Sequence, residues 1–394
     1  MTSSPLQTLK ILDFTTLLPG PFGTMLLADL GAEILRIEAP GRMDLLRLME
    51  PKDGGESVAH QYFNRSKKSI GLDLKHEGAV EIVKDLVKSY DILVEGFRPG
   101  VMAKLGLSYE DLKKVNPKII YVSLTGYGQT GPYANRAGHD INYQAVSGLA
   151  SYTGARGTGV VPTGLLAADV AGGSMHLVAG LLAAVVHRQS SGEGQAVDVS
   201  LTDAAFSLNT FYGANAIAGG KDPALAGEPL NGGGFYDHYL TADGEYMSVG
   251  GLEPVFLERF LKTLGLIELA PKIMSPKPAD QVAVKKAISA KFVEKTAEHW
   301  EAVFEEVDCC VERVLRVSQA AEHPQLKSRG MVVNVKKPSG GSQRQMACPL
   351  KFSGTKARYR EAGGALGAHS DEVMAILGYE KARISALREA GALV

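Results

Sequence analysis

The sequence predicts an α/β protein in which a large, doubly wound domain with a mainly parallel sheet carries a smaller α+β domain. In the first two hundred residues, short β-type runs alternate with helical patterns, which is typical of βαβ units. From about Gly220 the character changes, because Gly232–Gly234 leads into an expected β-hairpin. We therefore expect a large domain at 1–220, a small domain at 221–315, and a return to the large domain at 316–394.

The elements of the large domain follow from the spacing of apolar residues. A turn is expected at Pro19–Pro21 and a helix from there through Leu30. Another helix is expected from about Glu77 to Ser89, because its apolar residues form one stripe. A long apolar helix is expected to run from Asp169 to about Val186. Five runs are expected to be strands: Leu9–Phe14, Ile34–Glu38, Ser69–Leu74, Asp91–Glu95 and Ile119–Leu124.

The small domain and the tail show different patterns. Phe235–Gly251 reads as a hairpin with Ala242–Glu245 at its tip, and helical segments follow to about Phe304. The tail is expected to contain a strand at Met331–Val335 and two helices, near 371–377 and 382–390. Its composition is that of the first half, so both ends of the chain are expected to belong to the large domain.

Composition narrows the classes of function. The 394 residues are 45% hydrophobic, which is enough for a large core. The 42 Lys and Arg balance 43 Asp and Glu, so no global positive field exists to hold nucleic acid or an anionic membrane. The most apolar stretch, Leu177–Val186, is too short to span a bilayer. Three cysteines, Cys309, Cys310 and Cys348, lack zinc-site spacing and are too few for a disulfide framework. With no recognisable signal peptide, we expect a cytoplasmic protein.

Two residues are candidates for chemistry. His139 lies in Gly138–Tyr143, after the glycine-rich loop Thr125–Pro132 that follows an expected strand, and ligands of open α/β sheets bind at such strand ends. Asp169 lies at the start of the long apolar helix. Each residue also has a more ordinary interpretation, as a capping or packing histidine and as a helix N-cap or first-turn acid. Spacing alone does not decide between these interpretations.

A resemblance to a known family is carried by six segments: Gly20–Gly23, Leu30–Glu38, Asn64–Ser69, Glu95–Gly100, Gly126–Pro132 and Gly192–Val199. Together they resemble the class III CoA-transferase and α-methylacyl-CoA racemase superfamily over nearly the whole chain. Each segment is weak alone, but the combination is specific. The resemblance implies an interlocked homodimer, in which each subunit has a Rossmann-like large domain and a small domain threaded through its partner, with active sites between subunits.

The resemblance assigns roles to three residues. Asp169 matches the aspartate that both branches use, as nucleophile in transferases and as one half of an acid/base pair in racemases. His139 matches the histidine that is the other half of the racemase pair, where transferases usually have an aromatic residue. Glu253 matches the racemase glutamate that supports this histidine from the partner subunit, although a glutamate before Pro254 is also an ordinary helix N-terminal acid. The racemase branch is favoured.

Racemase chemistry gives this pair a physical reason. A thioester carbonyl acidifies the adjacent C–H, and inversion needs one group to remove a proton and another to return one to the opposite face. Histidine titrates near neutrality, and a carboxylate approaches that range when water is excluded. We therefore expect Asp169 to be enclosed by substrate. Donors for the enolate oxygen are expected among backbone N–H groups at the start of the Asp169 helix.

Binding of the CoA phosphates calls for cations and backbone amides. The cationic candidates after expected strands or on nearby helices are Arg36, Arg65, Lys67, Arg98 and Lys104. The resemblance favours Arg36, Arg98 and Lys104, the last at a position where relatives carry arginine, which binds phosphate bidentately. Tyr127 and Gly128 are expected to line the pantetheine or thioester channel. Because Gly20–Gly23 is not a dinucleotide fingerprint, no nicotinamide is expected, and neither is a metal; CoA enters as part of the substrate.

The sequence therefore predicts an α-methylacyl-CoA racemase or epimerase of lipid metabolism. The runner-up is a CoA-transferase that forms an aspartyl-CoA intermediate at Asp169. One segment favours that alternative, because Pro162–Ala168 before the aspartate reads closer to transferases. A noncatalytic acyl-CoA-binding protein is disfavoured because both His139 and Asp169 are present. The acyl group is left open.

Overall fold

The computed structural model describes residues 4–155 and 157–394, which form two compact units. The large unit contains the chain up to Ser147, together with Leu165–Leu208 and Gln325–Val394. The small unit contains Gly148–Gly164 and Asn209–Pro324. The unit limits thus fall at 208 and 324, where the sequence suggested 220 and 315, and residues 148–164 join the small unit.

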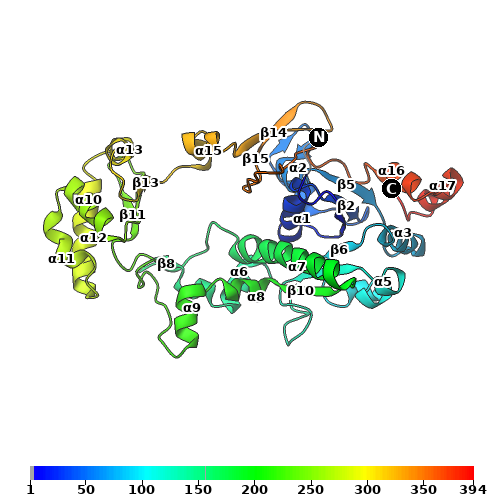
Figure 1. Cartoon of the computed structure of the whole chain (residues 1–394), viewed down its shortest axis with the longest axis horizontal. Coiled ribbons are helices and arrows are strands. Elements are labelled where there is room, and N and C mark those ends of the chain that lie inside the picture. The colour runs from blue at the N-terminus through cyan, green and yellow to red at the C-terminus, as the bar shows by residue number, and fades with distance from the viewer. Residues whose placement is uncertain (1–3, 156) are drawn as a thin grey trace. The chain divides into compact units, whose positions relative to one another are not determined.

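A six-stranded sheet organises the large unit (Figure 1). Its strand order is β10-β7-β6-β1-β2-β5, and every pair of neighbours is parallel. The expected α/β fold with a parallel sheet is confirmed. The strands are β1 (Lys10–Asp13), β2 (Glu33–Glu38), β5 (Lys67–Gly71), β6 (Ile92–Glu95), β7 (Ile120–Thr125) and β10 (Ala196–Ser200).

Helices cover both faces of this sheet because alternate residues of each strand point to opposite sides. On β1, Leu12 faces a core that contains α3 (Glu77–Val87), α5 (Tyr109–Val115) and α16 (Ser370–Ile376). Its neighbour Ile11 faces the other core, which contains α1 (Pro19–Asp29) and α7 (Met175–Ser191). The sheet is therefore enclosed on both sides, as its continuous apolar strands require.

Two expected elements differ in their limits. The turn expected at Pro19–Pro21 is the first turn of α1, because proline fits the start of a helix, where its missing N–H has no partner to lose. The strand expected at Ser69–Leu74 is β5, which begins at Lys67 and ends at Gly71. The first residue of β5 is Lys67, whose side chain is buried. A charged residue at this position does not indicate a buried strand in the sequence.

The small unit contains the expected hairpin, formed by β11 (Asp237–Leu240) and β12 (Tyr246–Val249). A third strand that the sequence did not reveal, β13 (Val311–Arg313), pairs antiparallel with β12. Four helices complete the unit's core around Phe260, Phe292 and Trp300. They are α10 (Pro254–Leu264), α11 (Ala270–Ile273), α12 (Pro278–Phe292) and α13 (Ala297–Glu305).

The tail, Gln325–Val394, belongs to the large unit. Its strand is β14 (Val332–Lys336), which forms a hairpin with the unexpected β15 (Ser342–Met346). The two terminal helices are α16 and α17 (Lys381–Glu389). The remaining elements are η1 (Leu45–Leu48), β3 (Lys52–Asp53), β4 (Glu56–Ser57), α2 (Val58–Phe63), α4 (Val101–Lys104), α6 (Asp140–Val146), η2 (Leu149–Tyr152), β8 (Gly154–Ala155), β9 (Gly159–Val160), η3 (Ala167–Ser174), α8 (Leu201–Ser207), α9 (Thr210–Ile217), η4 (Ile267–Leu269), α14 (Val317–Ala320) and α15 (Pro324–Ser328).

The apolar helix is longer than expected. Helical structure runs without a break over Ala167–Ser191, 25 residues that by length and composition alone could cross a membrane. The sequence estimate counted only Leu177–Val186. This helix packs against α1, β7 and β10, with Leu177 and Leu181 fully buried. A helix that packs on a sheet inside a core meets the same criteria, so its hydropathy is weak evidence for a membrane span.

Candidate active site

His139 is held at the start of α6 by a loop in which glycine is required. It is the N-cap residue, and its backbone N–H donates to Asn142 Oδ1 at 3.0 Å. The Tyr143 hydroxyl donates to the Gly138 carbonyl, which brings the tyrosine ring against the loop. A Cβ at Gly126 or Gly138 would lie 2.5 or 2.7 Å from the Tyr143 side chain, so no side chain fits there. The imidazole of His139 is left exposed.

Asp169 lies on η3, an eight-residue π-helix that leads directly into α7. π-Helical turns are rare in proteins, and those that occur are often found at functional sites. Its neighbours Gly172 and Gly173 let α8 approach closely, because a Cβ on Gly173 would lie 2.1 Å from the Leu201 side chain. This packing leaves Asp169 half-buried.

Asp140, the first residue of α6, joins the two elements. Its Oδ1 accepts the backbone N–H groups of Ala168 at 2.8 Å and Asp169 at 3.0 Å. Burial raises the pKa of Asp169 to about 6, the negative charge of Asp140 adds to the rise, and His139 opposes it. The large unit thus contains both His139 and a carboxyl group, that of Asp169, whose pKa lies closer to neutral pH than is usual for an aspartate.

The backbone donors expected at the start of the Asp169 helix are occupied. The amides of Ala168 and Asp169 donate to Asp140, and those of Val170 and Ala171 donate to the Leu166 carbonyl at 2.9 and 3.3 Å. The expectation failed because a neighbouring carboxylate and the wide π-turn satisfy these groups. On α6, the first amides have no carbonyl of their own helix to donate to, as at any helix start.

A cavity of about 690 Å³ opens at the carboxyl ends of β1, β2, β5 and β6. Apolar side chains, among them Phe14, Ile37 and Phe97, form much of its wall. Three cations also line it: Arg42, Lys75 and Arg98. Arg98 was predicted from the sequence. Burial raises the pKa of Tyr143 to about 12, the charge of Asp169 adds to the rise, and Arg98 opposes it, so charges at the cavity and at Asp169 both act on this tyrosine.

Three other predicted cations are buried in ion pairs. Arg36 donates to Asp44 at 2.9 Å, Arg65 pairs with Asp29 at 2.6 Å, and Lys67 Nζ lies 3.3 Å from Asp13 Oδ2. The side chains of all three are no more than 2% exposed. Each is therefore engaged in holding the large unit together in this structure, and a phosphate would have to compete with a buried carboxylate to reach it.

The remaining predicted residues of the large unit, Lys104, Tyr127 and Gly128, do not line this cavity. Lys104 is exposed at the end of α4, whose first residue, Val101, does line the cavity. Tyr127 packs edge-on against Tyr143, with ring centroids 5.2 Å apart. Gly128 has φ 80°, a conformation that favours glycine.

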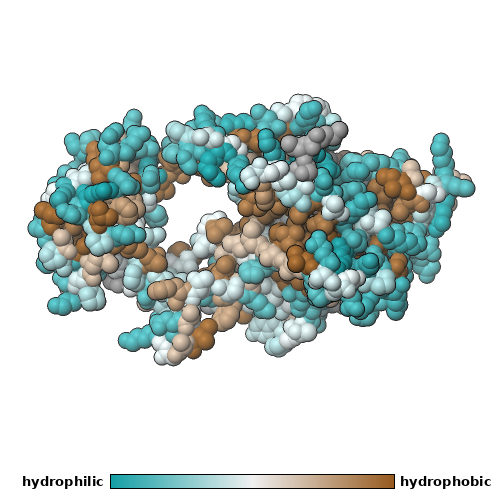
Figure 2. All heavy atoms as spheres, viewed as in Figure 1, coloured by the Kyte–Doolittle hydropathy of each residue, from teal (hydrophilic) through white to brown (hydrophobic). Residues whose placement is uncertain are grey.

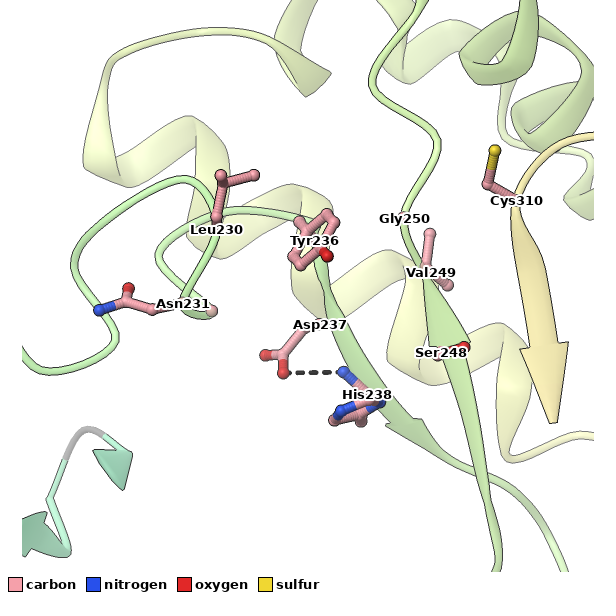
Figure 3. A pocket seen from close by; sticks show the side chains of 10 residues that line it. Leu230, Asn231, Tyr236, Asp237, His238, Ser248, Val249, Gly250 and Cys310 are labelled. Carbon is pink, nitrogen blue, oxygen red and sulfur yellow. Dashed lines mark hydrogen bonds between the residues drawn. The ribbon is translucent and has the colours of Figure 1, made fainter. Parts of the chain in front are cut away.

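Glu253 lies in the small unit, where it is the exposed N-cap residue of α10 without a side-chain capping bond. A cavity of about 340 Å³ lies in the same unit between the segment Leu230–Gly232 and strands β11 and β12 (Figure 3). Tyr236, Ser248 and Cys310 contribute to its lining. Burial raises the pKa of the Cys310 thiol, and the nearby Glu253 carboxylate adds to this rise, so Glu253 lies close to this cavity.

Comparison with known proteins gives the family. The family described as CoA-transferase family III matches residues 6–370. This chain belongs to that family. A CaiB/BaiF family protein from Brucella suis has a similar structure, with a TM-score of 0.84 and 28% identity over 96% of this chain and 100% of the other.

Curated relatives of this family III chain divide between two reactions. The human α-methylacyl-CoA racemase is 34% identical over 382 residues, 96% of this chain and 95% of the relative. Human succinyl-CoA:glutarate CoA-transferase is 32% identical, over 98% of this chain and 89% of the relative. Acetyl-CoA:oxalate CoA-transferase from Acetobacter aceti is 35% identical, over 89% and 90%. The chain is therefore an enzyme of this superfamily, and identity does not separate isomerase from transferase.

Sequence reasoning missed several residues of this family III site. Arg42 and Lys75 follow β2 and β5 at the same sheet edge as Arg98, which was the available signal for both. Asp140 was passed over because a first-turn acid is ordinary in any helix. Within residues 4–155 and 157–394, no group of three or more His, Cys, Asp and Glu is arranged to hold a metal ion.

Proposed function

We propose that this enzyme is an acyl-CoA racemase or epimerase that inverts the α-carbon of 2-methylacyl-CoA thioesters. The observation that carries the proposal is the joining of His139 and Asp169 through Asp140. One carboxylate oxygen of Asp140 accepts hydrogen bonds from the backbone of the Asp169 turn. Asp140 also directly follows His139 in the chain. An acid and a base are thereby fixed on two adjoining elements of one unit, as a two-base reaction needs.

The proposed step balances as a 1,1-proton transfer. Neutral His139 takes the α-proton, and the electron pair left on carbon delocalises onto the thioester oxygen as an enolate. Protonated Asp169 then gives its proton to the same carbon from the opposite face. His139 ends protonated and Asp169 ionised, so the next turnover runs through them in the reverse order. A pKa of about 6 suits Asp169 to both directions.

The enolate oxygen needs a donor, and the reaction needs no metal or redox cofactor because the thioester itself acidifies the α-carbon. With the first amides of η3 occupied, we propose the N–H groups of Asp140 and Ile141, which open α6 beside His139. This assignment replaces the donors expected from the sequence.

CoA is proposed to occupy the 690 Å³ cavity. Its volume lies in the range of small-molecule sites, and its walls are apolar with a few convergent cations, which suits an adenine with phosphates. Arg42, Lys75 and Arg98 would bind the phosphates, with Lys104 at the rim. We propose that the thioester end of the substrate points toward Asp169, because the charges of Asp169 and of Arg98, which lines the cavity, both act on Tyr143.

An interlocked homodimer is the proposed assembly. Several apolar side chains are exposed on helices, among them Val186 on α7 at 65%, Phe211 on α9 at 73% and Ile217 on α9 at 71%. Figure 2 shows apolar side chains on the visible surface over α9 and, separately, between α1 and α7. Exposed apolar patches of this kind indicate a surface that another protein covers. In this assembly Glu253 would support His139 of the partner subunit.

The test is deuterium incorporation from D2O at the α-carbon of a single-enantiomer 2-methylacyl-CoA, followed by mass spectrometry and chiral analysis. We expect exchange with inversion in the wild type, and loss of inversion of at least about a hundredfold in His139→Ala and Asp169→Asn. His187→Ala, an exposed histidine on α7, is the matched control and should retain full activity.

The alternative is a CoA-transferase with Asp169 as nucleophile, favoured by transferase relatives of similar identity and by the half-exposed carboxylate. Hydroxylamine added with acyl-CoA would then trap Asp169 as a hydroxamate. Trapping at Asp169, together with CoA transfer to an added carboxylate that survives loss of His139, would replace the racemase proposal.

A further inference from the structure

Asp140 is buried next to the two proposed acid/base residues without being one of them. It is 8% exposed, and each of its carboxylate oxygens has a partner within the large unit. Oδ1 accepts the amides of Ala168 and Asp169, and Oδ2 accepts a hydrogen bond from Gln144 Nε2. Gln144 lies one turn further along α6, so the carboxylate is fixed at both ends.

We infer that Asp140 is a positioning residue, which holds the backbone of the Asp169 turn on the start of α6 and fixes a carboxylate 3.0 Å from the Asp169 amide. This carboxylate also adds to the rise that burial causes in the pKa of Asp169. The inference rests on the proposed two-base function and deepens it. A first-turn acid that only stabilises its own helix faces the first amides of that helix. In Asp140, by contrast, Oδ1 accepts hydrogen bonds from two amides that lie 28 and 29 residues further along the chain.

Few titratable side chains other than Asp140 lie on the elements around Asp169. The elements packed against η3 are α1, α6, α7 and α8. Their titratable side chains are Asp29 on α1, His139, Asp140 and Tyr143 on α6, His176, His187 and Arg188 on α7, and Asp203 on α8. Of these, Asp140 raises the pKa of Asp169 and His139 lowers it, after burial, which has the largest effect. Asp29 is paired with Arg65.

The variant Asp140→Asn separates the two roles. Asparagine keeps an acceptor oxygen for the two amides but has no charge, whereas alanine removes both. Asp203→Asn is the matched control, because Asp203 is also a first-turn aspartate of a seven-residue helix, α8, and is exposed.

The protonation of Asp169 can be read without turnover. Labelling of carboxyls by a water-soluble carbodiimide and an amine follows the protonated fraction, and trypsin yields residues 157–188, in which Asp169 is the only carboxyl side chain. In Asp140→Asn we expect the pH midpoint of Asp169 labelling to fall by about one unit, because a like charge has been removed. Asp203→Asn should leave it unchanged. An unchanged midpoint in Asp140→Asn overturns the electrostatic role.

Positioning is read from α-proton exchange. We expect Asp140→Ala to lose at least about a hundredfold in exchange rate, and Asp140→Asn to recover to within about tenfold of the wild type with its acid limb moved to lower pH. Equal loss in both variants overturns the positioning role. Thermal melting and CoA binding monitor folding, and if the alanine variant does not fold, the labelling of Asp140→Asn still decides. Because labelling needs no turnover, a wild type inactive in exchange would refute the racemase proposal while leaving this test intact.

Discussion

Two buried glutamates show how neighbours decide the proton affinity of the same side chain. Burial alone raises the pKa of Glu38, but the guanidinium groups of Arg36 and Arg47 outweigh it and bring the pKa to about 2. Glu95 is equally buried but has no cation beside it. Burial raises its pKa to about 7, against the hydrogen bonds from Ser123 and the Phe97 amide, and Asp198 adds to the rise. The two residues therefore affect stability in opposite directions with pH.

For Glu95 the folded chain binds the proton more tightly than the unfolded chain, whose pKa is near 4.5. Its contribution to stability is therefore present below about pH 4.5 and is lost as the pH rises to about 7. We expect Glu95→Gln to raise the free energy of unfolding at pH 8 by up to about 3 kcal/mol, with no gain at pH 4. Urea unfolding at both pH values measures this, and an equal effect at pH 4 and pH 8 would contradict it.

Glu38→Gln serves as the comparison of opposite sign. The stabilisation from Glu38 is present above about pH 4.5 and is lost as the pH falls toward 2. Removal of its charge leaves Arg36 and Arg47 with one carboxylate fewer, so this variant should be destabilised by about 3 kcal/mol at pH 8. The same unfolding measurements cover both variants.

Residues of the candidate site could be singled out from the sequence where both the residue type and its position in the family pattern indicated a role. His139 stood out because it follows a glycine-rich loop after an expected strand, Asp169 because it begins the long apolar helix, and Arg98 because it follows an expected strand within a family segment. Arg36, Arg65 and Lys67 have the same sequence signals, yet the fold pairs each with a carboxylate distant in sequence or on the next loop. Their contact with CoA stays a prediction, since a sequence does not show which cations are already neutralised.

At the scale of elements, periodicity predicted five of the six strands of the parallel sheet, all except β10, and the β11–β12 hairpin. It could not give η3, because over eight residues the apolar pattern does not distinguish a π-helix from an α-helix. It also missed β13, which has three residues and pairs with the distant β12, and β15, whose residues are mostly polar. Long-range pairing is set by the whole fold rather than by local preference.

The loop that contains η1 forms one wall of the larger cavity and is held by Asp44. Asp44 caps η1 by accepting the Leu46 amide at 3.0 Å, and it also accepts the Leu17 amide at 3.2 Å and Arg36 at 2.9 Å. Leu17, in the loop after β1, also lines the cavity and has φ 62°, an unfavourable conformation for leucine. One carboxylate thus joins two segments that line the cavity.

We expect Asp44→Ala to weaken CoA binding by about tenfold or more, because both segments lose their common anchor and Arg36 loses a partner. Isothermal titration with CoA measures the loss. Asp53→Ala is the control, since Asp53 pairs with Lys337 and does not line the cavity. Equal affinity in Asp44→Ala and the wild type would show that the loop does not need this anchor.

At the scale of the whole molecule, the proposed residues are divided between two compact units. His139 and Asp169 lie in the large unit, and Glu253 lies in the small unit beside its own cavity. If Glu253 supports the histidine of another subunit, two variants that are inactive alone should restore each other. If it supports the histidine of its own chain, they should not.

Asp169→Ala and Glu253→Ala, carrying different tags, are therefore to be co-expressed and the doubly tagged dimers purified. In each heterodimer, the site that takes its acid/base pair from the Glu253→Ala chain receives an intact Glu253 from the other chain. We expect these dimers to regain about half of the wild-type exchange rate per dimer, because one of two equivalent sites is whole. Heterodimers of Asp169→Ala with Asp169→Asn, which share one defect, should remain inactive. Activity no higher than in that control would place Glu253 at the site of its own chain and refute the shared-site assembly, whereas a purely monomeric preparation would refute the dimer itself.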